Sequence, residues 1–209
     1  MGCGRRKGER MGEKRLPVIT ISRQYAAYGR TIARMLSERL DIPFYDRDVI
    51  RQTAKESGYS EEDIQKEGEA MSRASKFMNN LLNNASVYTS SYDGIYWAQR
   101  DVILKLAEKP CIIVGRCADY ILKEAGVPAF KIYLYADLED RIRRAGELEE
   151  NKGEDLRKIV PRRETLREVY YKQYTGQDMG VCSNYNICLD TGTLGAEKCT
   201  QILCDALQA

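Results

Sequence analysis

The stretch PVITISRQYAAYGRTIARML, residues 17–36, reads as a strand, a short break and a helix. Residues 17–22 form an apolar run rich in β-branched side chains, which predicts a buried strand. Apolar residues then recur at helical spacing, at Ile32, Met35, Leu36 and Leu40. A strand, a break and a helix in this order are typical of loops that bind phosphate through the backbone N–H groups of a helix start.

The break matches the sequence pattern of such a loop only in part. When the pattern G-x-x-x-x-G-K-[ST] is laid on residues 24–31, its four defined positions read Gln24, Gly29, Arg30 and Thr31. The second glycine and the hydroxyl match, whereas Gln24 replaces the first glycine and Arg30 replaces the lysine. On this motif alone, an ordinary strand, turn and helix explains the stretch better than a phosphate-binding loop does.

Composition limits the classes of protein to consider. The chain has 209 residues, of which 43% are hydrophobic and 31% charged, so it can fold as one sizeable domain. Its net charge of +2 is too small to indicate nucleic acid or a membrane surface as a partner. No apolar run approaches the roughly 20 residues of a membrane helix. We expect a cytoplasmic protein.

Cysteine and histidine usage narrows the chemistry. The seven cysteines form no C-x-x-C pair and the chain has no histidine, so a zinc site is disfavoured and reduced thiols are expected. Without histidine the commonest general base is missing. Any catalysis must therefore depend on carboxylates, arginines, lysines, backbone amides or a metal.

Further strand patterns alternate with helical ones along the chain. Apolar runs at 42–46, 110–115, 130–136 and 184–190 are separated by helical segments, and a last helix is expected over 194–207. Most of these runs are apolar on both faces, which predicts a parallel five-stranded sheet covered by helices in an α/β fold. Residues 1–15 are basic and are expected to form a mobile tail, with either Met1 or Met11 as the start.

Polar side chains follow two of these apolar runs, at sheet positions where open α/β sheets collect ligands. They are Gly115, Arg116 and Asp119 in VGRCADYIL (residues 114–122), and Asp46 and Arg47 in FYDRDVI (residues 44–50). Each has a plainer interpretation. Gly115 and Arg116 could form a simple turn with a solvated cation, and Asp46 could cap a helix.

Residues 137–178 form a highly charged helical region. Its arginines are Arg141, Arg143, Arg144, Arg162, Arg163 and Arg167, among many glutamates. Mixed charge of this kind is usually a solvated helix face with ion pairs one turn apart. The alternative is a lid that carries arginines onto a transferring phosphoryl group.

Together, these segments resemble the bacterial cytidylate kinase-like proteins, a branch of the P-loop nucleoside monophosphate kinases. The resemblance covers about residues 17–207. Its motifs are ITISRQYAAYGRTIA (19–33), IPFYDRDVI (42–50), IIVGRCADYIL (112–122), YYKQYTG (170–176) and NYNICLDTGTLG (184–195). The middle and last motifs are the most specific.

The resemblance implies a three-layer α/β/α P-loop NTPase-like fold with a helical acceptor-binding insertion and a helical lid. It implies a single kinase-like domain over 16–209, with its core at 16–47 and 109–207, the insertion at about 48–108 and the lid at about 141–178. It also implies transfer of phosphate from ATP, with Mg²⁺, to CMP or dCMP. The partners would be small-molecule nucleotides, with no nucleic acid and no membrane; the oligomeric state stays open.

Site residues follow from the same resemblance. The ATP phosphates would lie on Gln24, Tyr25, Ala26, Ala27, Tyr28, Gly29, Arg30 and Thr31, with Thr31 as the Mg²⁺ ligand. The acceptor would lie on Asp46, Arg47, Arg116 and Asp119. The catalytic arginines would be Arg30 and the lid residues Arg144, Arg163 and Arg167, with Glu164 orienting one of them. For Gln99 and Arg100 a solvated helix face is expected, with a place in the acceptor pocket as the alternative.

The phosphate loop is where the chain departs from the family. The family keeps glycine at the positions of Ala26 and Tyr28 and glutamate at that of Gln24. We expect Ala26 and Tyr28 to avoid positive φ angles, so that the loop holds phosphate differently or poorly. Two alternatives therefore stay open: a catalytically impaired protein that binds a nucleotide or phosphorylated ligand as a sensor or partner subunit, and a P-loop transferase with another acceptor.

Overall fold

The structure is a computed structural model that describes residues 17–46, 48, 50 and 92–208. The expected tail at 1–15, Arg47 and residues 51–91 of the expected insertion lie outside the described residues. The described strands are β1 (Val18–Arg23), β2 (Phe44–Tyr45), β3 (Ile112–Val114), β4 (Ala129–Tyr135) and β5 (Ile187–Asp190). They form one parallel sheet in the order β2-β3-β1-β4-β5. The predicted parallel five-stranded sheet is confirmed.

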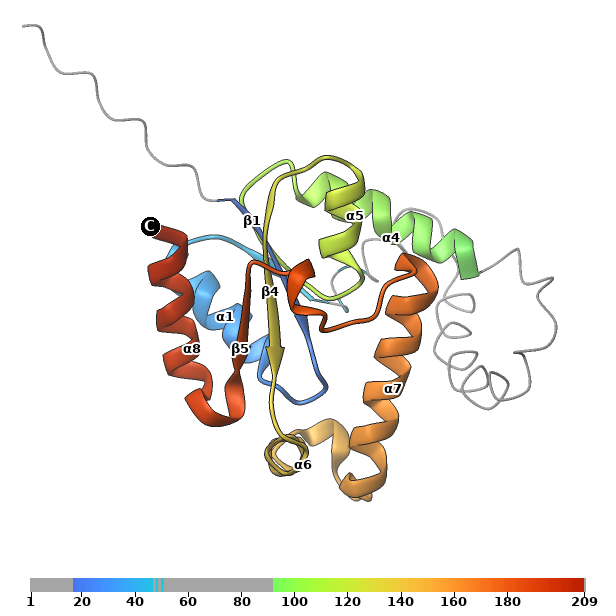
Figure 1. The fold of residues 1–209 in the computed structure, drawn as a ribbon, viewed down its shortest axis with the longest axis vertical. Coiled ribbons are helices and arrows are strands. Elements are labelled where there is room, and N and C mark those ends of the chain that lie inside the picture. The colour runs from blue at the N-terminus through green and yellow to red at the C-terminus, as the bar shows by residue number, and fades with distance from the viewer. Residues whose placement is uncertain (1–16, 47, 49, 51–91, 209) are drawn as a thin grey trace, which may run out of the picture.

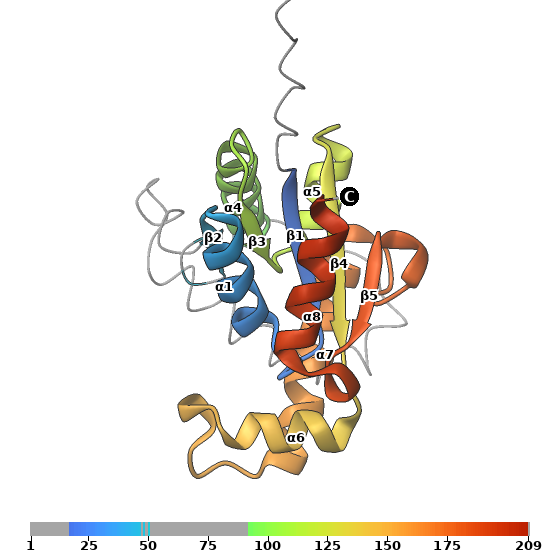
Figure 2. The same ribbon diagram turned by 90° about the vertical axis from the view of Figure 1, so that its left-hand side faces the viewer.

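Helices cover both faces of this sheet. On one face lie α1 (Gly29–Leu40) and α8 (Thr191–Gln208), which pack against each other. The other face carries α4 (Tyr92–Leu106), α5 (Ala118–Glu124) and part of α7 (Leu156–Thr175). The two helical layers stand on either side of the strands in Figure 1, and Figure 2 shows the sheet after a quarter turn. The predicted three-layer α/β/α fold is confirmed.

The central strand β1 explains why its sequence is apolar without a break. Successive side chains of a strand point to opposite faces. Ile19 and Ile21 are fully buried in the core under α1 and α8, whereas Val18 belongs to the core under α4 and α5. Both faces of β1 are therefore buried, and a run of β-branched residues satisfies both cores.

The charged region forms helices at the carboxyl end of the sheet. It consists of α6 (Leu138–Gly146), the short 3₁₀ helix η1 (Glu149–Asn151) and α7. In Figure 1, α6 lies beyond the end of β4, and α7 runs from there back along the sheet. None of the helices in the described part of the chain has both the length and the apolar composition that a bilayer span needs.

Candidate functional site

A pocket of about 570 Å³ opens at the carboxyl ends of β1 and β3. It is lined by all of residues 24–31, and by Arg23, Asp46, Asp48, Gly115, Arg116, Arg144, Glu150, Arg163, Arg167, Tyr170 and Tyr171, among others. Six arginines and three carboxylates therefore face one cavity, and the lining contains no lysine among the described residues. Such an excess of guanidinium groups favours an anionic ligand.

The loop between β1 and α1 adopts the backbone that glycine would adopt easily. Ala26 has φ 61° and Tyr28 has φ 56°, both in the left-handed region. The expectation that these residues avoid positive φ is therefore wrong: the region is small but open to side chains, at a cost of about 1–2 kcal/mol per residue. Such turns, followed by the free N–H groups of a helix start, form a concave anion site. No acidic side chain lies in the first turn of α1 to compete for it.

Gln24 anchors the beginning of the loop to the neighbouring strand. Its backbone N–H donates to the carbonyl of Leu134 at 3.0 Å, and its Oε1 accepts from the N–H of Ala136, also at 3.0 Å. The side-chain oxygen is thus engaged by the residue that follows β4. Gln24 lines the pocket, and its observed contacts fix the loop.

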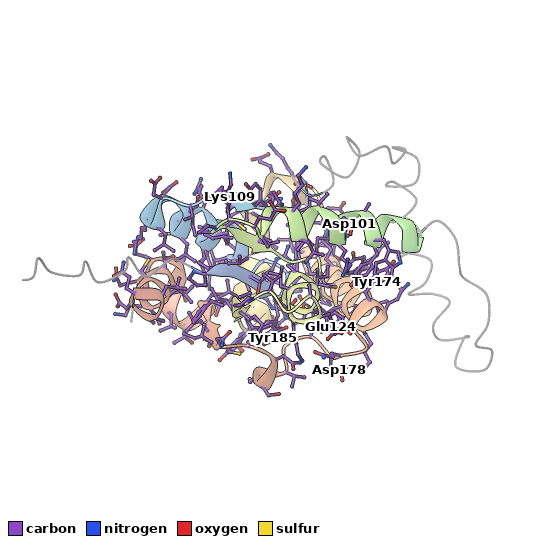
Figure 3. All side chains as sticks on the ribbon, turned by 90° about the horizontal axis from the view of Figure 1, so that it is seen from above. Asp101, Lys109, Glu124, Tyr174, Asp178 and Tyr185 are labelled. Atoms are coloured by element: carbon purple, nitrogen blue, oxygen red, sulfur yellow. The ribbon has the colours of Figure 1, made fainter. Side chains whose placement is uncertain are left out.

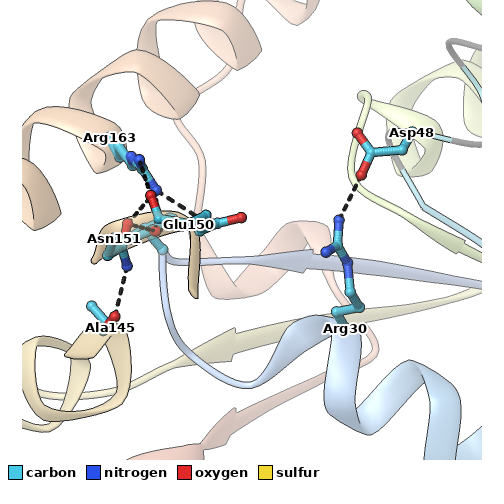
Figure 4. A network of polar contacts seen from close by, with 7 residues as sticks. Arg30, Asp48, Ala145, Glu150, Asn151 and Arg163 are labelled. Atoms are coloured by element: carbon cyan, nitrogen blue, oxygen red, sulfur yellow. Dashed lines mark hydrogen bonds and ion pairs between the residues drawn. The ribbon is translucent and has the colours of Figure 1, made fainter. Parts of the chain in front are cut away.

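Arg30 points toward Asp46 and Asp48, which also line the pocket. Its Nε lies 2.8 Å from Asp46 Oδ2, and its Nη2 lies 2.9 Å from Asp48 Oδ2, a pair that Figure 4 draws. The Arg30 side chain is 60% exposed. For Arg30 to hold ATP phosphates, as the sequence predicts, it must exchange these carboxylates for phosphate oxygens.

Arg144 reaches the loop from α6. Its Nη2 donates to Thr31 Oγ1 at 3.3 Å, its Nη1 pairs with Glu147 at 2.6 Å, and its guanidinium lies 4.8 Å from the centre of the Tyr28 ring. Arg144 of α6 therefore contacts both Thr31 and Tyr28. Thr31, which is the predicted Mg²⁺ ligand, is engaged by this arginine.

Tyr25 joins the loop to η1 and α7. Its hydroxyl lies 2.8 Å from Glu150 Oε1 and 2.9 Å from Asn151 Oδ1. Arg163 Nη1 donates to the same three groups: Glu150 at 3.0 Å, Asn151 at 2.6 Å, and the Tyr25 hydroxyl. Asn151 in turn donates to the carbonyl of Ala145 (Figure 4). Sequence reasoning missed Asn151 and the hydroxyl of Tyr25, because neither belongs to a phosphate-binding pattern.

Glu164 lies buried beneath this network. It is 6% exposed and accepts from the backbone N–H of Tyr25 and from Arg141 Nη1, the latter at 3.3 Å. Burial raises the pKa of Glu164, and the Tyr25 N–H, Arg167 and Arg141 oppose that rise. The predicted orienting role of Glu164 thus has a partner, although its bonded partner is Arg141, with Arg167 next to it.

Of the residues predicted to bind an acceptor, Arg116 lines the pocket and Asp119 lies behind its wall. Arg116 lines the pocket, and its guanidinium lies 5.1 Å from the centre of the Tyr170 ring. Asp119 is 4% exposed and does not line the pocket; its Oδ2 accepts from the Tyr171 hydroxyl at 2.8 Å. α5 turns the Asp119 side chain inward, and its contact with an acceptor stays a prediction. Arg47 lies outside the described residues.

A cluster of aromatic rings lies where α4 meets the end of α7. Tyr96 and Tyr174 stack with ring centres 4.2 Å apart, and Figure 3 labels Tyr174 on α7 beside α4. Gln99 is 1% exposed and its Oε1 accepts from the Tyr170 hydroxyl at 3.3 Å, so its expected place on a solvated face is wrong. Arg100 is partly exposed, with its guanidinium 5.7 Å from the centre of the Trp97 ring.

The burial of Asp119 predicts a pH-dependent stability. Burial raises the pKa of Asp119, against the lowering effect of the Tyr171 hydroxyl. The folded state therefore holds this proton to a higher pH than the unfolded chain, and stability falls as pH rises from the ordinary aspartate pKa to the raised one. Asp119→Asn lacks this pH-dependent loss of stability. The urea midpoint of the variant minus that of the unmodified protein should therefore increase from pH 4 to pH 7. Asp101→Asn, at a 77% exposed side chain, is the control; a difference independent of pH would contradict the prediction.

Comparison with known proteins identifies cytidylate kinases among the relatives of this chain and kinases among the solved structures that share its fold. The model of the cytidylate kinase-like family matches residues 18–193. Cytidylate kinase of Archaeoglobus fulgidus is 25% identical over 196 residues, covering 91% of this chain and 94% of the relative. Among solved structures, an uncharacterised protein of Eubacterium ventriosum has a TM-score of 0.70 at 20% identity, covering 93% of this chain and 99% of that one. Shikimate kinase of Bacteroides thetaiotaomicron has a TM-score of 0.57 at 14% identity, with the same coverage, and shares the fold.

Proposed function

The chain belongs to the cytidylate kinase-like family, and from that premise we propose that it transfers the terminal phosphoryl group of ATP to a nucleoside monophosphate, CMP or dCMP. The observation that carries the proposal is the single pocket in which six arginines surround the start of α1. A reaction between two phosphorylated substrates brings many negative charges to one place. A pocket built from guanidinium groups suits that requirement.

The donor lies on the loop in this proposal. Backbone N–H groups of residues 26–31 bind the ATP phosphates, and Arg144 and Arg163 close over them from the lid. Arg167, which lines the same pocket from α7, faces the transferring group. Fixed cations of this kind stabilise the charge that develops in phosphoryl transfer.

The acceptor phosphate lies at Arg116 in this proposal, with Asp46 and Arg30 beside it. An oxygen of the acceptor phosphate attacks the γ-phosphorus, the bond from that phosphorus to the bridging oxygen of ADP breaks, and ADP and a nucleoside diphosphate leave. The attacking oxygen is already anionic, so no general base is needed and the lack of histidine is no obstacle. Asp119 acts behind the wall by holding Tyr171, which lines the pocket.

Magnesium would enter with ATP. The described residues that suit it are the Thr31 hydroxyl and the carboxylates of Asp46 and Asp48, all of which line the pocket. This oxygen donor set fits a metal that keeps several waters and is bound mainly by substrate phosphates. Arg144 and Arg30, which hold these oxygens in the present structure, would have to release them. When bound, the metal would neutralise charge on the ATP phosphates.

Two segments of the chain have separate roles in this proposal. Residues 141–178 act as the lid, because α6, η1 and α7 carry Arg144, Arg163 and Arg167 to the loop. The segment at about 48–108 contributes the acceptor side, and its described helix α4 places Gln99 against Tyr170 of the pocket wall. Base selectivity would depend on this segment.

Steady-state assays test the proposal directly. Magnesium-dependent ADP formation from ATP is measured with and without each of CMP, dCMP, UMP, AMP and GMP. Turnover that requires one monophosphate, with CMP or dCMP preferred, is the expected result. Folded protein that forms no ADP with any member of the panel would contradict a kinase of this class.

The second candidate, a binding protein without turnover, is favoured by the pairing of the pocket cations with the protein's own groups. Arg30 is held by Asp46 and Asp48, and Arg163 by Glu150. This candidate predicts stabilisation by ATP or a nucleoside phosphate without ADP formation. ADP formed only when a monophosphate is present would exclude it.

Restoring glycine in the loop separates the two candidates further. Ala26→Gly removes left-handed strain and should raise stability by up to about 1 kcal/mol, with kcat changed less than threefold. Tyr28→Gly removes the same strain but also the ring that lies under Arg144, and it should lower kcat/KM at least tenfold. A large gain of activity in Tyr28→Gly would instead indicate an impaired kinase. Thermal unfolding and steady-state kinetics measure both variants.

A further inference from the structure

Arg23 lines the pocket, although no phosphate-binding pattern includes it. It is the last residue of β1, and its side chain runs from the start of α1 to the turn that follows β3. A Cβ placed on Gly29 would lie 2.8 Å from Arg23 Cγ, and one placed on Gly115 would lie 2.0 Å from Arg23 Nη1. Two glycines therefore make room for this side chain, and its guanidinium reaches the position next to Arg116.

In the described part of the chain, Arg23 has more arginines than carboxylates acting on it. Among residues 17–46, 48, 50 and 92–208, no ion pair within 4.0 Å involves Arg23, in contrast to Arg30, Arg144 and Arg163. Burial lowers the pKa of Arg23 well below its usual value, and Arg167, Arg116 and Arg30 lower it further. Glu164 is the carboxylate that opposes this effect.

Such an arrangement opposes folding unless an anion arrives. A partly buried guanidinium among other guanidinium groups is destabilised by desolvation and by repulsion. Arg23 nevertheless lines the pocket and stays accessible from it. A cation kept at a cost in stability inside a cleft indicates a functional position.

We propose that Arg23 binds the phosphoryl group at the point of transfer, between the donor phosphates on the loop and the acceptor phosphate at Arg116. The part of this inference that concerns phosphoryl transfer rests on the proposed function. The part that concerns polyphosphate binding rests on the pocket alone. The side chain passes Gly29 on the donor side and ends at Gly115 on the acceptor side, so it spans both substrates. Arg23 thereby supplies the cation that a standard phosphate loop takes from its lysine, while Arg30 turns to Asp46 and Asp48.

Replacing Arg23 should leave the stability of the protein unchanged or higher and should weaken its binding of phosphate. Arg23→Gln removes one charge from a cluster of like charges, so the melting temperature without ligand should be unchanged or higher. The same variant should bind inorganic tripolyphosphate and ATP at least 30-fold more weakly, because the central contact to phosphate is lost. Calorimetric titration and thermal unfolding of the full chain measure both quantities. The matched control is Arg34→Gln, at an exposed arginine of α1, which should change the affinity less than twofold.

Arg23→Lys covers the case in which the glutamine variant does not fold. Lysine keeps the charge but not the planar fork, so this variant should fold and lose at least tenfold in kcat/KM. Tripolyphosphate affinity within threefold of the unmodified protein in Arg23→Gln, or an unchanged kcat/KM in Arg23→Lys, would overturn the role of Arg23.

The two proposals fail in different ways. If the unmodified protein phosphorylates no monophosphate, the proposed function fails. Tripolyphosphate binding still decides Arg23 in that case: an Arg23-dependent affinity supports a phosphate site at this residue, and an Arg23-independent one overturns it.

Discussion

Arg116→Ala should lower kcat/KM for the nucleoside monophosphate by on the order of 10²–10³-fold, the loss typical of one fixed donor at a developing charge. Arg116 lines the pocket at the carboxyl end of β3, and its guanidinium is placed by the Tyr170 ring at 5.1 Å. Alanine keeps the fold because the left-handed backbone at this position, φ 57°, is as accessible to alanine as to arginine. The loss should fall on the acceptor more than on ATP, and it is measured by varying each substrate in turn.

The control for Arg116→Ala is Arg157→Ala. Arg157 forms an ion pair with Glu139 at 2.8 Å, and both side chains are more than half exposed, so its removal should change kcat/KM less than twofold. Arg116→Lys should recover part of the activity but not all of it, since lysine cannot bind phosphate through two parallel hydrogen bonds. Losses below tenfold in both Arg116→Ala and Arg30→Ala would count decisively against the proposed roles of these arginines.

The fold was predictable because strand and helix periods are local properties of the chain. The run at residues 17–22 could be identified as a doubly buried strand, since β-branched residues there satisfy two cores at once. Residues 110–115 and 130–136 gave the same signal and became β3 and β4. What local patterns do not contain is the spatial order of the strands, which β1 decides by pairing with both β3 and β4.

Residues of the candidate site could be predicted only where they belong to a recognisable sequence motif. Arg116 lies on the pocket wall as expected, because the carboxyl ends of parallel strands meet at one edge. Asp119 does not, since three residues further along, α5 turns its side chain toward the core. Arg23 was missed because its role depends on Gly29 and Gly115, which are 86 residues apart in sequence and supply the space for its side chain.

The backbone of the loop shows a further limit of motif reasoning. Glycine is the residue that reaches positive φ at least cost, so its absence at Ala26 and Tyr28 suggested a different loop. The left-handed region is nevertheless open to other residues when surrounding contacts hold it. Here the backbone of Gln24 is bonded to Leu134 of β4, Tyr25 to Glu150 of η1, and the Tyr28 ring contacts Arg144, and these contacts fix the loop on both sides.

Glu164→Ala should lower the free energy of unfolding by about 3–5 kcal/mol, because it leaves buried positive charge without its carboxylate partner. Glu164 accepts from Arg141, which is 8% exposed, and from the backbone N–H of Tyr25. Arg167, whose pKa is lowered by burial and raised again by Glu164, loses its nearest opposing charge as well. Urea unfolding measures the loss. Glu168→Ala, at an exposed position one turn further along α7, should change the stability by less than about 0.5 kcal/mol.

A double replacement tests the cause of that loss. If stranded charge is the reason, Arg141→Met in the Glu164→Ala background removes one unpaired cation and should restore part of the lost stability, whereas the two effects would add if the residues acted independently. The stability of Glu164→Gln should lie between those of the unmodified protein and Glu164→Ala, since its amide oxygen still accepts from the Tyr25 N–H but carries no charge. A loss in Glu164→Ala that Arg141→Met deepens would show that Glu164 acts by packing, and that the lid and the phosphate loop are not joined through this carboxylate.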